Sequence, residues 1–223
     1  MNLEKIQKVL TYHFRQIKLL EQALTHRSYS RGSNYERLEF LGDSVLNLVI
    51  TENIYLREPE ASEGELSRIR ASLVKQEALA RVARDMDLGD YINLGGGELK
   101  SGGYRRSSIL SDTLEAIIGA IYLDGGFDAA RESTIALYRD YLHNLPDSTT
   151  LKDDKTRLQE YLQSKQIELP EYQVVKTVGK SHDQVFTVTC KVDSITLEST
   201  GKGLSRKKAE QDAAHRALQQ LKL

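Results

Sequence analysis

Apolar residues recur at helical spacing along the first two thirds of the chain. Apolar positions three and four residues apart are typical of one face of a helix. On this pattern we predict helices over residues 3–10, 17–24, 36–56, 65–86, 109–123 and 129–145. The glycine-rich stretch from Leu94 to Gly103 interrupts the pattern and predicts an exposed loop. The first part of the chain is therefore expected to be all-α up to Pro146.

The periodicity changes after a short polar segment, residues 146–150, which predicts a linker. Beyond it, an amphipathic helical pattern precedes three runs that alternate between apolar and polar residues as strands do. The predicted elements are a helix around residues 158–162, strands over 172–178, 185–192 and 195–200, and a helix over 209–221. We therefore predict an all-α domain over residues 1–146. A small α+β domain with the order α-β-β-β-α should follow over residues 151–223.

Composition adds little except in its distribution along the chain. The 223 residues are 28% charged with a net charge of −1, as in an ordinary globular protein. Acidic residues are in excess before residue 151 and basic residues from there on, which indicates separate tasks for the two parts. No apolar run approaches the roughly 18 residues of a membrane span. The start of the chain lacks the apolar core of a signal peptide, so we expect a cytoplasmic protein without membrane contact.

A first acidic cluster lies on the predicted helix 36–56. Glu36, Glu39 and Asp43 follow the spacing i, i+3, i+7, which places them within about 60° of one helix face. The opposite face is apolar and carries Leu38, Leu41, Val45 and Val49. Taken alone, this cluster is equally well explained as a solvated acidic face.

The second acidic cluster is harder to explain as a solvated face. Asp112 and Glu115 lie in the predicted helix 109–123, which is apolar on nearly every side and is therefore expected to be buried. Buried carboxylates are costly unless they are protonated, paired or bound to a metal. Gly119, on the same face, has no side chain and would leave room for a close approach.

Together, the two clusters predict a site for a hard cation. Carboxylate oxygens suit Mg²⁺, with Mn²⁺ as a substitute, and Mg²⁺ keeps several waters, so few protein ligands suffice. The predicted ligands are Glu39, Asp43, Asp112 and Glu115. Such an ion can activate a water and neutralise a phosphate. One cysteine, Cys190, and five scattered histidines offer no tetrahedral zinc site. We expect Cys190 to be a buried apolar residue and His26 to be a hydrogen-bonded structural histidine.

The last predicted helix has an unusual start. Ser205 is a suitable N-cap, yet the first turn carries Arg206, Lys207 and Lys208. Cations at this end oppose the helix dipole, at a cost of roughly 0.3–1 kcal/mol each. Their placement is explained if an external anion such as a phosphate binds there.

Other polar residues of the second domain could extend this surface. Gln159 and Glu160 lie away from the apolar stripe of their helix, where they could reach groove hydroxyls and base edges. His182 lies in the turn 179–183 between two strands and could make a third contact. Each feature alone is more often a solvated surface group. Their joint order within one α-β-β-β-α unit is more specific and favours nucleic-acid binding.

At this point the motifs show a family resemblance. Residues 36–44, ERLEFLGDS, resemble the signature of the ribonuclease III family, and residues 112–116, DTLEA, resemble its second acidic motif. Residues 151–223 resemble a double-stranded-RNA-binding domain. The resemblance implies a Mg²⁺-dependent endoribonuclease that cuts double-stranded RNA to 5′-phosphate and 3′-hydroxyl ends. It also implies that Asp43 and Glu115 matter most for hydrolysis. Precursors of ribosomal and transfer RNA and structured messenger RNAs are the implied substrates.

The resemblance also implies a homodimer and no small-molecule cofactor. Glu36 falls at a position associated with the subunit contact, and Phe40 offers a ring that a partner could cover, unless Phe40 packs within its own domain. The chain departs from many relatives at Glu210, where a lysine is common, so we expect modest phosphate affinity. The rival functions are a non-catalytic RNA binder, which four intact carboxylates disfavour, and a hydrolase of small phosphate esters, which a tethered RNA-binding domain disfavours.

Overall fold

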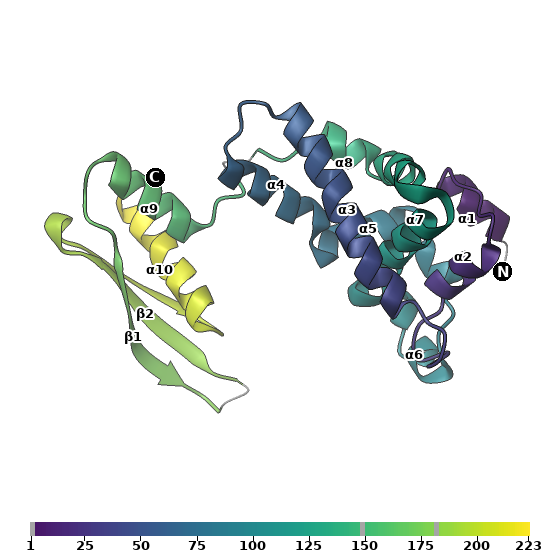
Figure 1. Cartoon of the computed structure of the whole chain (residues 1–223). Coiled ribbons are helices and arrows are strands. Elements are labelled where there is room, and N and C mark those ends of the chain that lie inside the picture. The colour runs from purple at the N-terminus through teal and green to yellow at the C-terminus, as the bar shows by residue number, and fades with distance from the viewer. Residues whose placement is uncertain (1–2, 148–149, 181–182) are drawn as a thin grey trace. The chain divides into compact units, whose positions relative to one another are not determined.

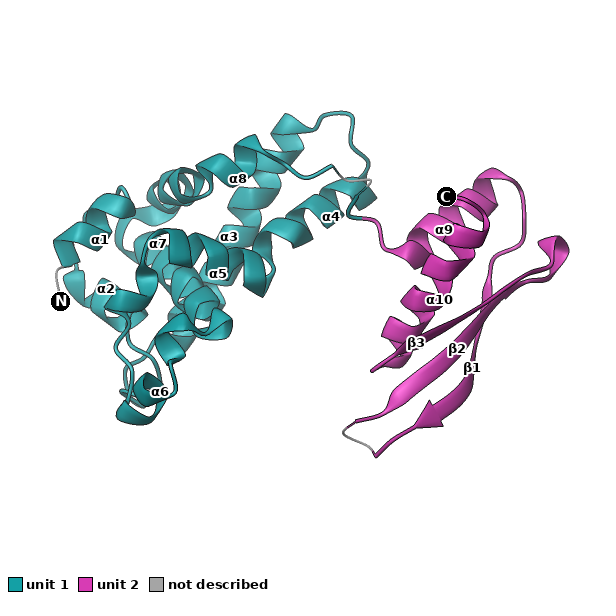
Figure 2. Ribbon diagram, turned by 180° about the vertical axis from the view of Figure 1, so that it is seen from behind, with its two compact units in different colours: residues 1–151 teal, residues 152–223 magenta. Residues whose placement is uncertain are grey.

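The chain divides into two compact units in a computed structural model that describes residues 3–147, 150–180 and 183–223 (Figure 1). Unit 1 spans residues 1–151 and unit 2 spans residues 152–223 (Figure 2). Unit 1 is helical and unit 2 has the order α-β-β-β-α, so the predicted fold class is confirmed. None of the helices in the described residues is both long and apolar enough to cross a membrane.

Unit 1 is built from helices joined by short turns. Its helices are α1 (Leu3–Val9), α2 (Ile17–Ala23), α3 (Glu36–Arg57), α4 (Glu63–Val74), α5 (Gln76–Asp85), α6 (Gly96–Lys100), α7 (Ser107–Leu137) and α8 (Arg139–His143). The first three agree with the sequence prediction to within a residue. The single helix predicted over residues 65–86 is wrong, because Lys75 adopts an extended conformation and separates α4 from α5.

The stretch predicted as an exposed loop, residues 94–103, is mostly exposed, but the prediction that it is all loop is wrong. The stretch contains α6 and leads into a 3₁₀ turn, Gly103–Arg105. The Glu98 carboxylate pairs with the Arg106 guanidinium at 3.0 Å, which ties α6 to the start of α7. An ion pair between two elements does not show in the spacing of apolar residues. The prediction for this stretch therefore rested on its glycines alone.

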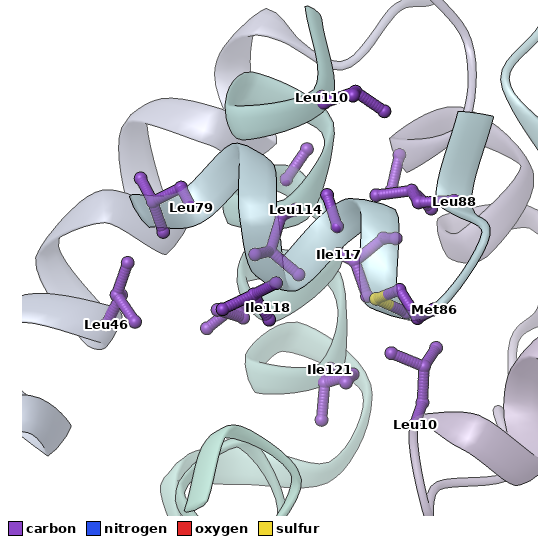
Figure 3. Close-up of a cluster of buried hydrophobic side chains, with 14 of the residues drawn as sticks. Leu10, Leu46, Leu79, Met86, Leu88, Leu110, Leu114, Ile117, Ile118 and Ile121 are labelled. Carbon is purple, nitrogen blue, oxygen red and sulfur yellow. The ribbon is translucent and has the colours of Figure 1, made fainter. Parts of the chain in front are cut away.

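The core of unit 1 surrounds α7. Figure 3 shows side chains from several segments packed around the apolar stretch of this helix, with Leu46, Leu79 and Leu88 among them. Leu114, Ile117, Ile118 and Ile121 are all 0% exposed, which confirms that this part of the helix is buried. α7 consists of two helical segments that meet at a kink, so the break predicted between the helices over 109–123 and 129–145 is confirmed, although the second segment ends at Leu137 and α8 follows it. The kink falls at Gly126, whose φ of 85° a residue with a side chain rarely adopts.

The Asp124 carboxylate, close to the kink of α7, binds the loop that follows α1. Asp124 is 8% exposed and accepts hydrogen bonds from the Tyr12 hydroxyl at 2.8 Å, the Arg15 amide at 2.7 Å and the Gln16 amide at 2.9 Å. These bonds hold its pKa below the ordinary value although burial acts in the opposite direction.

Two glycines allow α3 and α7 to touch backbone to backbone. A Cβ atom at Gly42 would overlap the backbone carbonyl of Glu115, and one at Gly119 would overlap the backbone carbonyl of Leu38. The sequence predicted that Gly119 leaves room for a close approach, and the structure shows that α3 itself makes that approach. Because the acidic residues lie beside these glycines in both helices, the contact brings the two acidic clusters together.

Unit 2 places two helices on one face of an antiparallel sheet with the strand order β1-β2-β3. Its elements are α9 (Asp154–Ser164), β1 (Glu171–Val178), β2 (Val185–Val192), β3 (Leu197–Gly203) and α10 (Arg206–Gln220). The predicted third strand, 195–200, begins too early because residues 193–195 form a 3₁₀ turn and Thr196 has a positive φ of 53°. It also ends too early, since Gly201 and Gly203 extend β3 closely along α10. Cys190 is fully buried, as predicted.

We predict that Gly42→Ala lowers the free energy of unfolding by about 1–3 kcal/mol or more, because the methyl group forces two helix backbones apart. Thermal unfolding would measure the change. Gly64→Ala is the matched control, since a Cβ at this α4 position would meet only the Arg68 Nη1 atom at 3.5 Å. The control should keep or slightly raise stability, because alanine is the better helix former. A Gly42→Ala variant as stable as the control would contradict the packing argument.

Candidate metal centre and nucleic-acid interface

Three carboxylates from α3 and α7 converge in unit 1. Glu39, Asp112 and Glu115 each offer an oxygen, and these atoms all lie within 4.8 Å of one another. Within the described ranges of the chain, they form the one group of three or more histidine, cysteine or acidic residues with metal-ligand spacing. All three are half-buried. This donor set fits a hard divalent cation that keeps part of its water shell.

Asp43, the fourth predicted ligand, is not part of that group. It is exposed, and the Asn47 Nδ2 atom donates to its Oδ1 atom at 2.8 Å and to its backbone carbonyl at 2.9 Å. Asp43 is still close enough for its charge to raise the pKa of Glu39 and of Glu115. The structure therefore brings three predicted ligands together and places Asp43 at their edge. Sequence reasoning missed Asn47, although its i+4 spacing from Asp43 was a usable signal.

The carboxylates of this group disfavour one another's ionisation. Burial, and then the charges of Asp43, Asp112 and Glu39, raise the pKa of Glu115 to about 8. Burial, followed by Asp112, Glu36 and Asp43, raises the pKa of Glu39 to about 7. Burial also raises the pKa of Asp112. A divalent cation would favour the ionised forms, so protons and metal compete for the same oxygens.

A cleft of about 960 Å³ opens beside two of these acids, Glu39 and Asp112, and is otherwise lined largely by polar residues. His26, at its wall, is 8% exposed and its Nδ1 atom is hydrogen-bonded to the Ser28 hydroxyl at 2.7 Å. Burial lowers the pKa of His26, so the ring is neutral at pH 7, as expected for the predicted structural histidine. The cationic side chains that line the cleft are Arg27, Arg31 and Arg106.

The two predicted subunit-contact residues lie on exposed parts of α3. The Glu36 carboxylate pairs with the Arg27 guanidinium at 3.4 Å and is not one of the three convergent acids. The Phe40 side chain is 80% exposed, so unit 1 does not cover the ring. Leu48 and Tyr55 are also exposed and lie within about 80° of Phe40 around the helix, so three exposed apolar side chains share this face with Ser44 and Thr51.

In unit 2 the starts of α9 and α10 border a groove of about 760 Å³. Of the predicted RNA contacts, Gln159, Arg206 and Lys207 line this groove. The predicted N-cap is confirmed, because the Ser205 hydroxyl accepts from the Lys208 amide at 3.2 Å. The Lys208 side chain is exposed but does not line the groove.

The other predicted contacts are less directly placed. Glu160 is exposed, but its carboxylate pairs with the Lys152 ammonium at 2.6 Å outside the groove. His182 lies outside the described residues. The groove also contains Glu210 and Lys155, whose side chains pair at 2.7 Å. Sequence reasoning missed Lys155, because its role depends on the packing of α9 against α10.

Two family models together match nearly the whole chain. A model described as Ribonuclease-III-like matches residues 16–141, and a model described as double-stranded RNA binding motif matches residues 155–221. The Histophilus somni protein named ribonuclease 3 is 52% identical over 223 residues, which covers 100% of both chains. The Nitrosococcus oceani protein of the same name is 55% identical over 218 residues, or 97% of this chain and 93% of that one.

Unit 1 also resembles a solved structure, the nuclease domain of ribonuclease III from Campylobacter jejuni. The two are 45% identical with a TM-score of 0.61, and the match covers 62% of this chain and 97% of that one. The description of that structure refers to flexibility in a region involved in dimer formation. A second structure of the same domain matches with 44% identity and a TM-score of 0.60.

The acidic group predicts how stability depends on pH in the absence of metal. The folded-state pKa values of Glu115 and Glu39, about 8 and about 7, lie above the ordinary value of 4.5. Between these limits the folded state binds more protons than the unfolded state, so the free energy of unfolding falls as the pH rises. Glu115→Gln should reduce this slope and raise stability at pH 8 by roughly 1–3 kcal/mol, after a discount for solvent screening.

Thermal unfolding between pH 5 and pH 8 in a chelator would measure this effect. Glu60→Gln, at an exposed position of the same unit, is the control for loss of one negative charge. If Glu115→Gln keeps the full wild-type slope, the raised pKa has been assigned to the wrong residue.

Proposed function

The chain belongs to the ribonuclease III family, whose nuclease domain is a double-stranded-RNA-specific endoribonuclease, and we propose that it cleaves RNA with Mg²⁺ held between α3 and α7. The convergence of Glu39, Asp112 and Glu115 within 4.8 Å supports this proposal. The family matches support the rest, because they cover both the nuclease unit and the RNA-binding unit.

Each carboxylate has a proposed role in hydrolysis. Glu39, Asp112 and Glu115 would hold the ion, with Mn²⁺ as a substitute for Mg²⁺. When bound, the ion supplies an activated water and neutralises charge on the phosphate. The Asn47 side chain fixes Asp43, and the resemblance of residues 36–44 and 112–116 to the family motifs supports giving Asp43 and Glu115 the greatest share in hydrolysis.

Unit 2 is proposed to hold A-form RNA. Arg206 and Lys207 in the groove, together with Lys208 beside it, would bind phosphates, and Gln159 would reach 2′-hydroxyl groups. Glu160 and His182 remain predicted contacts. Recognition would depend on duplex shape rather than base sequence, because the major groove of A-form RNA is too narrow for side chains to read.

A homodimer would explain how both strands of a duplex are cut. The strands run in opposite directions, so two identical sites related by a two-fold axis can each cut one strand. The exposed side chains of Phe40, Leu48 and Tyr55, which share one face of α3, support a contact with a second copy there. The products would be 5′-phosphate and 3′-hydroxyl ends with short 3′ overhangs. We further propose precursors of ribosomal and transfer RNA and structured messenger RNAs as substrates in the cytoplasm.

The acidic residues are predicted to serve cleavage rather than RNA binding. Asp43→Asn and Glu115→Gln should each lose cleavage by orders of magnitude, because these two carboxylates are proposed to have the greatest share in hydrolysis. Duplex affinity should be retained, because the RNA-binding surface of unit 2 is unchanged. A labelled RNA duplex incubated with and without Mg²⁺, with product sizes and end groups determined, would measure cleavage, and Glu60→Gln is the control. Near-wild-type cleavage by either variant at saturating Mg²⁺ would remove that carboxylate from the proposed mechanism.

The dimer makes a separate prediction about strand cleavage. Mixed dimers of one wild-type and one Glu115→Gln chain should nick only one strand of each duplex, because only one of two sites is active. Denaturing electrophoresis of duplexes labelled on either strand would reveal nicking, and wild-type dimers are the control. A chain that sediments as a monomer at micromolar concentration and still makes coordinated double-strand cuts is incompatible with the dimer.

A further inference from the structure

A buried carboxylate lies inside the groove that is proposed to bind RNA. Glu210, on the first turns of α10, is only 9% exposed and lines the groove together with Arg206 and Lys207. Within the described part of unit 2, it is the one buried residue with a charged side chain. A negative charge in this position opposes the binding of a polyanion, so its partners need to be considered.

Each oxygen of Glu210 is bonded to a different cation of the groove. Oε1 accepts from the Arg206 Nε atom at 2.8 Å, and Oε2 accepts from the Lys155 Nζ atom at 2.7 Å. These cations hold the pKa of Glu210 below its usual range, so the carboxylate is ionised at neutral pH. The Lys155 ammonium also lies 4.4 Å from the centre of the Tyr172 ring, which fixes it further.

The charged side chains that line the groove have only a small excess of positive charge. Lys155, Arg206 and Lys207 are opposed by Glu210 and Asp153. Asp153 is the N-cap of α9, where its side chain accepts a hydrogen bond from the Thr156 amide at 2.9 Å. Its carboxylate therefore also stabilises the start of the helix. Glu210 has no capping role among the described contacts, and the two side chains bonded to its carboxylate are both cations.

We propose that Glu210 is an attenuating residue for double-stranded RNA: its carboxylate takes the contacts with Arg206 and Lys155 that a backbone phosphate would otherwise receive. The inference rests on the proposed binding of RNA in this groove. A phosphate that enters must share these cations with an anion already present. Lys207 makes no ion pair among the described contacts, although its charge helps to lower the pKa of Asp153, so it is the cation of the groove most available to RNA.

The alternative is that Glu210 assists binding by orienting Arg206, and the two effects have opposite signs: loss of the carboxylate weakens RNA binding if it orients Arg206 and strengthens RNA binding if it competes with phosphate. An exposed ion pair orients a side chain with an effect of at most about fivefold, and often much less. Freeing one cation for a phosphate contact changes the salt slope by about one and the affinity by about fivefold near 0.15 M salt. Because Arg206 is 65% exposed and bonded to Glu210 through Nε alone, the orienting effect is the smaller one.

The test measures duplex binding by the full chain in a chelator, which prevents cleavage, across a range of salt concentrations. Glu210→Gln should bind a labelled RNA duplex about fivefold more tightly near 0.15 M salt, with a slope steeper by about one. Glu198→Gln is the matched control, because this carboxylate on β3 is 60% exposed, pairs with Lys191 at 3.3 Å and lies outside the groove. The control should stay within twofold of wild type. Unchanged or weaker binding by folded Glu210→Gln, without a change in slope, overturns the proposal.

A second comparison does not require substitution of Glu210. Arg206→Ala should weaken wild-type binding less than Lys207→Ala does, because Arg206 is already engaged by Glu210. Equal losses from the two variants overturn the attenuation. If wild-type chain does not bind the duplex, or Lys207→Ala has no effect, the proposed RNA-binding groove is itself wrong, which distinguishes the two failures.

Discussion

The contact between the backbones of α3 and α7 is the constraint on which the nuclease unit depends. Gly42 and Gly119 remove the side chains that would otherwise separate the two helices. Glu39 lies one turn before the first glycine, and Glu115 lies one turn before the second. The contact between the two helices therefore also brings these carboxylates together. The same contact therefore determines both the packing of the core and the distances within the proposed metal site.

This arrangement uses the stability of the core to hold like charges together. Carboxylates that repel one another and are half out of water oppose folding, as the raised pKa values of Glu39 and Glu115 show. The fully buried side chains of α7, among them Leu114 and Ile118, offset that cost. A cation would enter a site whose oxygens are already positioned, so little ordering would be needed on binding.

The sequence predicted those features that depend on local pattern. The first three helices, the acidic motifs and the Ser205 cap all follow from spacing within one element. The helix α6 and the pairing of Lys155 with Glu210 did not, because each involves an ion pair with a residue of another element. The break at Lys75 has no counterpart in the spacing of apolar residues. Asp43 marks the limit for the site: helical spacing places it on the acidic face, but only the bond from Asn47 shows that its side chain stands apart from the other three.

The three hydrogen bonds that Asp124 accepts also bear on the order in which unit 1 folds. Their donors, on Tyr12, Arg15 and Gln16, precede Asp124 by 112, 109 and 108 positions in the chain. Closing so long a loop costs entropy before any bond is gained, and the bonds require α7 to be in place already. We therefore expect the N-terminal segment to lock onto the helical core late in folding, as a closing step rather than as a nucleus.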